Sequence, residues 1–174
     1  ALGREQSARA ELARHAQALS ESRARFEHLF EQSPAPTWVE DWRALQGWLE
    51  ARRREGVTEL RVLLEQEPQR VREALGLVRV LDVNEAAVRL TGAGSRAELA
   101  ESLTRLFTNQ AYRNFMDVLT ALWEGRSHIE HETNLQRLDG GMRELMVRLD
   151  VPRLGAGPEL DFANVIVTAT DITE

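Results

Sequence analysis

Residues 80–92 read VLDVNEAAVRLTG, and this stretch decides most of the predicted fold. The segment from Leu77 to Val83 is apolar and rich in β-branched residues, which is typical of a strand. Asn84 is a favoured N-cap residue and Gly92 a favoured helix terminator, so a short helix is expected over residues 85–91. A strand that passes directly into a capped helix indicates a domain in which helices cover a sheet.

The chain before this stretch is predicted to be mainly helical. Residues 1–32 contain no proline and many Ala, Leu, Glu and Arg residues, so we expect one long helix there. The two prolines within residues 33–36 end this helix, because proline cannot donate to the helical hydrogen-bond ladder. A short strand is expected over residues 37–39. Residues 41–76 then hold three short helices with apolar faces, separated by glycine and proline.

After this stretch, the spacing of apolar residues changes from a helical pattern to a strand pattern. A capping box at Ser95–Glu98 and an N-cap at Asn109 predict two further helices. From Ser127 onward the apolar period changes from that of a helix to that of a strand. Three strands are expected, over residues 129–135, 144–151 and 162–170. A hairpin turn at Asp139-Gly140-Gly141 joins the first two. The sequence therefore predicts an α+β fold with an at least partly antiparallel sheet that helices cover on one face.

Composition excludes several classes of protein. The chain has 174 residues, 22 basic against 28 acidic residues and a net charge of −6, and it contains no cysteine. All of the basic residues are arginine. Disulfides, cysteine-linked chromophores, thiolate nucleophiles and Schiff-base lysines are therefore excluded. The acidic balance provides no field for nucleic acid, and no apolar run approaches the roughly 20 residues that span a membrane. We expect a soluble, cytoplasmic domain without membrane insertion that is part of a longer protein.

Catalytic and metal-binding patterns are not found in the sequence. His128 and His131 are three apart in a predicted strand, so they point to opposite faces and cannot share a metal ion. The sequence contains no Gly-x-Ser-x-Gly elbow and no phosphate-binding loop. We therefore assign no catalytic residue and no metal ligand, and we do not expect this domain to be an enzyme.

Aromatic residues gather on the elements that are predicted to surround the space between helices and sheet. They either form an ordinary core or line a cavity for a small molecule. Three strand residues, His131, Arg148 and Asn164, can supply polar groups that orient a ligand. The candidate pocket residues are Trp38, Trp42, Tyr112, Phe115, His131, Met146 and Arg148.

The predicted helix over residues 1–32 carries a narrow apolar stripe at spacings of four and three. The stripe comprises Leu12, Ala16, Leu19, Arg23, Phe26 and Phe30. In one interpretation it pairs two subunits as a coiled coil, and the dimer residues are then Leu12, Leu19, Phe26 and Phe30. In the other, the helix lies on its own domain through Phe26, Leu29 and Phe30.

Three phrases resemble those of the PAS domain, the sensory module of bacterial signalling proteins. They are FEHLFEQSP at residues 26–34, the stretch at residues 80–92, and DITE at residues 171–174. The resemblance implies a five-stranded antiparallel sheet with helices on one face. It also implies a linker and dimerisation helix over residues 1–32 and a sensor domain over residues 33–174.

The helical insertion at residues 41–76 departs from the usual pattern of that family. The phrase Trp38-Val39-Glu40-Asp41-Trp42 resembles a bacterial subgroup in which a similar phrase opens such an insertion. The insertion either caps the cavity or extends the dimer, and the sequence leaves both open.

The resemblance also implies a function. A homodimer relays the state of a small organic ligand or a partner to a C-terminal output domain, of histidine kinase (two-component) or diguanylate cyclase type, and Asp171 and Thr173 carry the relay. The alternative is a ligand-free module for dimerisation and protein–protein interaction. The cofactor stays unknown: flavin-photoadduct members need a cysteine, and haem-binding members commonly use a histidine on the long helix, which residues 109–124 lack.

Overall fold

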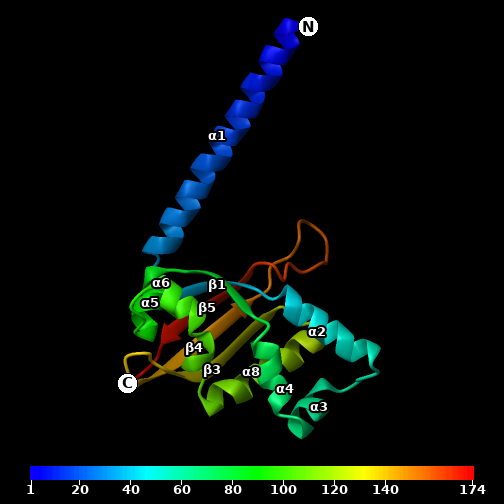
Figure 1. Ribbon diagram of the computed structural model, residues 1–174, viewed down its shortest axis with the longest axis vertical. Helices are drawn as coiled ribbons and strands as arrows, with labels where there is room; N and C mark the ends of the chain where they lie inside the picture. Colours follow the sequence, from blue (N-terminus) through cyan, green and yellow to red (C-terminus); the bar gives the residue numbers. More distant parts are fainter. The chain divides into compact units, whose positions relative to one another are not determined.

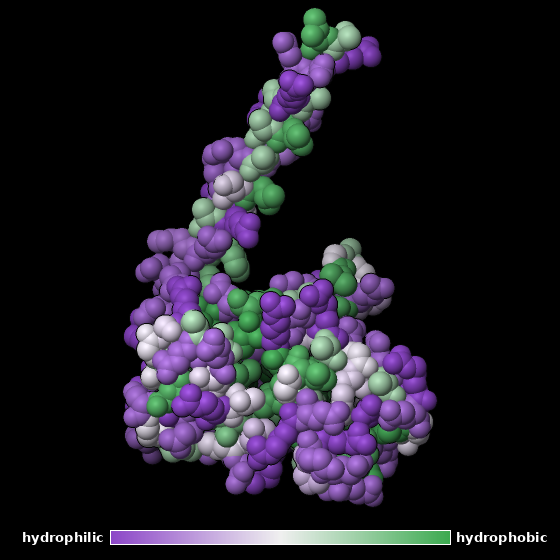
Figure 2. Space-filling view, in the orientation of Figure 1, coloured by the Kyte–Doolittle hydropathy of each residue, from purple (hydrophilic) through white to green (hydrophobic).

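The computed structural model describes residues 1–174 as two compact units, Ala1–Ser33 and Pro34–Glu174. The first unit is a single helix, α1 (Leu2–Gln32), in which no residue is buried. Strongly hydrophobic side chains are visible on the surface of this helix (Figure 2). Leu12, Leu19 and Phe26 expose 70%, 71% and 61% of their surface. Helix α1 therefore presents an apolar stripe that its own unit does not cover.

The second unit is built on one antiparallel sheet of five strands in the order β2-β1-β5-β4-β3 (Figure 1). The last three strands form two consecutive hairpin-like pairs, β3 with β4 and β4 with β5. Strand β1 lies between β2 and β5 and is antiparallel to both. The strands are β1 (Thr37–Asp41), β2 (Arg79–Val83), β3 (His128–Gln136), β4 (Met142–Asp150) and β5 (Val165–Asp171).

Seven helices lie over one face of this sheet (Figure 1). They are α2 (Arg43–Arg54), α3 (Leu60–Gln66), α4 (Gln69–Leu75), α5 (Glu85–Thr91), α6 (Arg96–Glu101), α7 (Leu103–Leu106) and α8 (Asn109–Trp123). Together with the sheet they confirm the predicted α+β class, with helices on one face of a five-stranded antiparallel sheet.

Asn84 caps α5, as the stretch at residues 80–92 predicted, and its side chain also bonds to the backbone at the start of β1. Its side chain is fully buried, and Oδ1 accepts hydrogen bonds from the backbone N–H groups of Ala87 and Thr37, both at 3.0 Å. The Asn84 Nδ2 group donates to the carbonyl of Ala35 at 2.9 Å. Gly92 ends α5 with a φ of 70°, a conformation that glycine adopts at little cost.

Several element boundaries differ from the predicted ones. Strand β5 begins at Val165 because Asp161 forms a turn, in which its carboxylate accepts from Ala163 N and from Asn164 Nδ2. Phe162 therefore lies before the strand, and Asn164 belongs to the turn. Strand β2 begins at Arg79 because residues 77 and 78 still donate to carbonyls of α4. Thr108, one residue earlier than predicted, caps α8.

The insertion at residues 41–76 is part of the domain core. Helices α2, α3 and α4 pack with α8 in one apolar cluster, in which Leu45, Leu64 and Leu119 are fully buried. Two arginines of the insertion also lie over aromatic rings of α8, Arg53 over Trp123 at 3.9 Å and Arg72 over Tyr112 at 3.8 Å. A second apolar cluster, around α5, α6 and α7, packs on the other part of the sheet.

Candidate functional site

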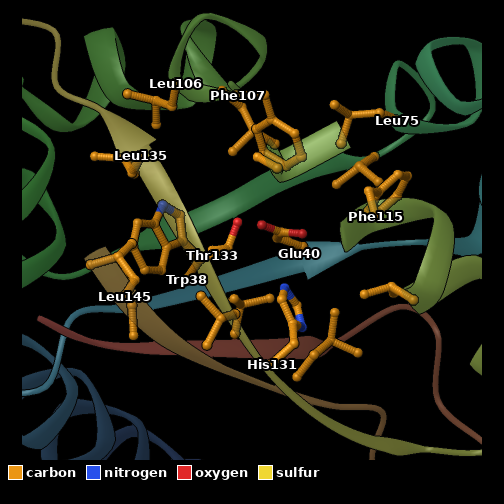
Figure 3. A pocket seen from close by; sticks show the side chains of 18 of the residues that line it. Trp38, Glu40, Leu75, Leu106, Phe107, Phe115, His131, Thr133, Leu135 and Leu145 are labelled. Atoms are coloured by element: carbon orange, nitrogen blue, oxygen red, sulfur yellow. The ribbon is translucent and has the colours of Figure 1, made fainter. Parts of the chain in front are cut away.

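A cavity of about 120 Å³ lies between the helices and the sheet (Figure 3). Hydrophobic side chains are visible between the helices in the middle of this face (Figure 2). Apolar and aromatic residues dominate the wall of the cavity, which comprises Trp38, Glu40, Trp42, Leu75, Val78, Leu103, Leu106, Phe107, Ala111, Phe115, Val118, His131, Thr133, Asn134, Leu135, Leu145, Val147, Leu149, Val167 and Ala169. Trp42 and Leu75 belong to the insertion at residues 41–76, so the insertion contributes to the cavity wall.

Four of the seven candidate pocket residues lie in this wall, namely Trp38, Trp42, Phe115 and His131. Tyr112 is not among the lining residues and packs instead against Phe107 and beneath the Arg72 guanidinium. Met146 and Arg148 alternate along β4 with the lining residues of that strand and lie on the opposite face of the sheet. There Arg148 forms an ion pair with Glu130.

Three buried polar atoms of the wall have no hydrogen-bond partner in the protein: Trp38 Nε1, His131 Nδ1 and Thr133 Oγ1. One other buried side-chain atom shares this property, Nε of Arg52, which lies outside the wall. Buried polar groups in folded proteins are almost always paired. The gathering of unpaired atoms at one cavity makes it the candidate binding site of the domain.

Glu40 is the one acidic residue of the wall, and it is only 5% exposed. Its Oε2 atom accepts a hydrogen bond from Trp42 Nε1 at 2.7 Å. Burial raises the pKa of the Glu40 carboxyl to about 7, and the bond from Trp42 opposes this rise. At neutral pH this carboxyl exists in both protonation states.

His131 lies across the cavity from the first strand, on β3. Burial lowers the pKa of its imidazole below the ordinary value, while Asp117 on α8 opposes the change. The ring is therefore neutral at pH 7, and Nδ1 can accept or donate a hydrogen bond. No arginine lines the cavity, so the wall contains no permanent positive charge.

Sequence reasoning did not select Glu40 and Thr133 as pocket residues. Both follow from the period of two in a strand, because Glu40 shares a face with Trp38 and Thr133 shares one with His131. A β-bulge between Val39 and Glu40 also shifts the pairing of β1 with β2. Local sequence gives no signal for such a bulge.

The two candidate relay residues lie at the end of β5. The Thr173 hydroxyl accepts a hydrogen bond from Glu144 N at 2.9 Å, and Thr173 N donates to Asp171 Oδ1 at 2.9 Å. Hydrogen bonds from Thr173, made by its side chain and its backbone N–H, lower the pKa of Asp171. Arg143 forms an ion pair with Asp171 at 3.4 Å, and Ile172 N donates to the carbonyl of Glu144. The chain that leaves β5 is therefore held against the start of β4.

No group of three or more His, Asp or Glu side chains is arranged to hold a metal ion. Judged by length and hydropathy, none of the helices can cross a bilayer.

Solved structures of PAS domains have the same architecture. The PAS domain of an HTR-like protein from Haloarcula marismortui is 18% identical, with a TM-score of 0.52, and the match covers 92% of this chain and 99% of that one. A PAS domain from Colwellia psychrerythraea is 13% identical, with a TM-score of 0.55 and coverages of 89% and 98%. The chain has the PAS fold.

A third PAS-like neighbour is a domain of a sensory box sensor histidine kinase/response regulator from Geobacter sulfurreducens. It is 13% identical, with a TM-score of 0.52, and the match covers 88% of this chain and 96% of that one. No protein-family model matches the sequence, and no curated protein matches it either. The likeness to solved PAS domains therefore rests on three-dimensional structure and confirms the fold that the three sequence phrases indicated.

Proposed function

We propose that this chain is the sensory PAS module of a bacterial signal-transduction protein and that its cavity binds a small ligand. The gathering of Trp38 Nε1, His131 Nδ1 and Thr133 Oγ1 around one cavity carries this proposal. A buried polar group without a partner costs about 1–3 kcal/mol. A bound molecule that pairs with these atoms removes that cost, so the folded protein favours a ligand with matching polar groups.

Strand β5 links the cavity to the end of the chain. Val167 and Ala169 line the cavity, and two residues later the strand ends at Asp171. A ligand that binds two arrangements of β5 with different affinities shifts the equilibrium between them. The bonds of Asp171 and Thr173 to the start of β4 pass this shift to the segment that follows.

The same proposal includes a C-terminal output domain in the longer protein, of histidine kinase or diguanylate cyclase type, and a homodimer formed through α1. The neighbour from Geobacter sulfurreducens, a domain of a sensor histidine kinase/response regulator, supports the first of these output types. The PAS module itself carries no catalytic step in this scheme, and the output domain supplies the enzymatic activity.

Native mass spectrometry of freshly purified residues 1–174 tests the ligand. We expect a bound mass in addition to the mass of the chain, and a rise in melting temperature when that compound is added back, because selective binding stabilises the folded state. A chain that carries no bound mass and responds to no compound of a metabolite panel contradicts the ligand-binding proposal.

The relay is tested by Asp171→Ala in the longer protein that contains the output domain. We expect output activity to lose its dependence on the cavity ligand while the ligand is still retained, because Asp171 lies outside the cavity wall. Asp139→Ala is the matched control. Asp139 is also an exposed aspartate in an ion pair, with Arg137, but it lies in the β3–β4 turn. Unchanged regulation in Asp171→Ala would count against the relay.

The second candidate function is a ligand-free module for dimerisation and protein docking. The exposed stripe of Leu12, Leu19 and Phe26 on α1 favours it, since soluble proteins rarely leave a long apolar stripe uncovered. This function needs no cavity ligand. It therefore predicts no bound mass, and dimers that form equally well with and without added metabolites.

A further inference from the structure

We infer that the cavity ligand is a small organic amine, bound as its ammonium ion with Glu40 as the counter-ion. This inference rests on the proposed function, in which the cavity takes up a ligand. It goes further because it assigns the charge and the size of that ligand and the residue that selects it.

The charge of the wall favours a cation. Glu40 accepts one hydrogen bond, from Trp42, and forms no ion pair. Buried carboxylates in proteins are nearly always paired with a positive group. The wall contains no arginine, and His131 is neutral. The protein thus provides no cation for Glu40, and an anionic ligand would meet a carboxyl group without any positive partner.

The polar atoms near Glu40 match the geometry of an ammonium group. Figure 3 shows the side chains of Glu40, Thr133 and His131 directed into the same space, with the Thr133 hydroxyl toward the Glu40 carboxyl. The Thr133 oxygen and the neutral His131 Nδ1 accept hydrogen bonds, and an ammonium group carries several N–H donors. One ammonium group can therefore pair with a carboxylate and with two atoms that have no partner in the protein.

Aromatic rings surround this polar group. Trp38, Trp42, Phe107 and Phe115 all line the cavity, and the rings of Trp42 and Phe115 meet edge to face at 5.9 Å. Aromatic faces attract organic cations through their quadrupole, and cages of such rings recognise alkylated ammonium groups. The remaining unpaired atom, Trp38 Nε1, is a donor only, so the ligand also carries a hydrogen-bond acceptor on its body.

The volume of the cavity sets the size of the ligand. A cavity of roughly 150 Å³ in another protein accommodates benzene, and the cavity here measures about 120 Å³. The cavity is thus slightly smaller than one that encloses benzene. Because it is only partly enclosed, a ligand of one six-membered ring with a short substituent can extend beyond it at the open side.

Three probes of similar size and different charge test the inference on residues 1–174: benzylamine, benzyl alcohol and benzoate. Dissociation constants are measured by titration calorimetry at pH 8, where Glu40 is mainly ionised. We expect benzylamine to bind at least about tenfold more tightly than benzyl alcohol, a difference of about 1.4 kcal/mol. Benzoate is expected to show no binding.

Glu40→Gln is the deciding variant, because glutamine retains the size of the side chain and an oxygen that accepts from Trp42. We expect it to weaken benzylamine binding about tenfold or more and to leave benzyl alcohol binding within about twofold. Glu130→Gln is the control, since Glu130 lies on the opposite face of the sheet and pairs with Arg148. It is expected to change neither constant.

The pH dependence gives a second readout. Benzylamine affinity is expected to rise from about pH 6 to about pH 8 as Glu40 loses its proton. The other charged groups near the site are paired or neutral: His131 faces Glu40 from β3, Asp117 of α8 pairs with Arg61, and Asp41 of β1 pairs with Arg43. If the Glu40→Gln variant loses the pH dependence of benzylamine affinity, Glu40 is the group responsible for that dependence.

Each outcome decides the inference. Equal or tighter binding of benzyl alcohol, an unchanged benzylamine constant in Glu40→Gln, or no binding of any probe overturns the ammonium ligand. Benzyl alcohol binding that is as tight as benzylamine binding overturns only the charge of the ligand and leaves the sensory function standing. The sensory function itself fails separately, when native mass spectrometry finds no bound mass and the metabolite panel has no effect.

Discussion

Glu40 and Asp41 are neighbours in β1, yet their environments drive their pKa values in opposite directions. The Glu40 side chain points into the apolar cavity, and burial raises its pKa to about 7. Asp41 points to the other face, where hydrogen bonds from Arg43 lower its pKa to about 2. The alternation of side chains along a strand is sufficient to produce this contrast.

The stability of the domain should therefore depend on pH through Glu40. The folded protein keeps a proton on Glu40 that the unfolded chain, with a pKa of 4.5, releases at lower pH. The free energy of unfolding thus falls as pH rises from about 4.5 to about 7, by about 3 kcal/mol for this residue, since one pKa unit corresponds to about 1.4 kcal/mol. Urea unfolding of the wild type and of Glu40→Gln at several pH values checks this.

The difference between the two proteins isolates Glu40 from other titrating groups. His131 acts in the opposite direction, because its lowered pKa makes stability rise with pH, but it does so in both proteins. We expect Glu40→Gln to lack the fall that the wild type shows. Parallel pH profiles for the two proteins would show that Glu40 titrates normally in the folded state.

Sequence reasoning found much of the aromatic part of the cavity and one polar residue, His131, but missed Glu40 and Thr133. It selected Met146 and Arg148, although the same alternation that places Leu145, Val147 and Leu149 at the cavity directs these two residues to the opposite face. Tyr112 was selected from helical spacing, but Ala111, Phe115 and Val118 form the lining row of α8 and Tyr112 lies beside it. The strand period places Glu40 and Thr133 on the cavity face of the sheet, but their residue types, which are usually exposed, do not indicate that the fold buries them.

At the scale of elements, Asn84 joins three segments through one side chain. It caps α5 by accepting a hydrogen bond from Ala87 N. It also bonds to the backbone of Thr37, within β1, and of Ala35, just before β1. The sequence predicted the cap from residue type and position. It gave no sign of the bonds to residues almost fifty positions earlier, because a residue preference describes only local structure.

Asn84→Ala is expected to destabilise the domain by about 3 kcal/mol. Loss of a helix cap costs about 1 kcal/mol, and the buried backbone groups that lose their partner add about 1–3 kcal/mol. Ser95→Ala is the matched control: Ser95 caps α6 through Glu98 N alone and is exposed, so about 1 kcal/mol is expected. Chemical denaturation measures both values. Equal losses in the two variants would mean that Asn84 acts only as a cap.

At the scale of the whole molecule, the sequence predicted the neighbours β3, β4 and β5, because short connections favour antiparallel pairs. The position of β1 between β2 and β5 did not follow from any local pattern. That pairing joins segments more than a hundred residues apart, and the resemblance to PAS domains was needed to expect five strands. The packing of the insertion against α8 also did not follow from any local pattern and became apparent only in the structure.

Removal of residues 1–21 tests the proposed role of α1 in the assembly of two chains. No residue of α1 is buried, and the second unit has its own core, so the truncated chain should fold and retain its cavity ligand. Because Leu12 and Leu19 are lost, sedimentation velocity is expected to show a shift from dimer to monomer that the full 174-residue chain does not show at the same concentration. Leu12→Ser with Leu19→Ser in the full-length helix should give the same shift, which separates loss of the apolar stripe from loss of helix length. An unchanged sedimentation coefficient in both variants would assign dimerisation, if it occurs, to a surface other than α1.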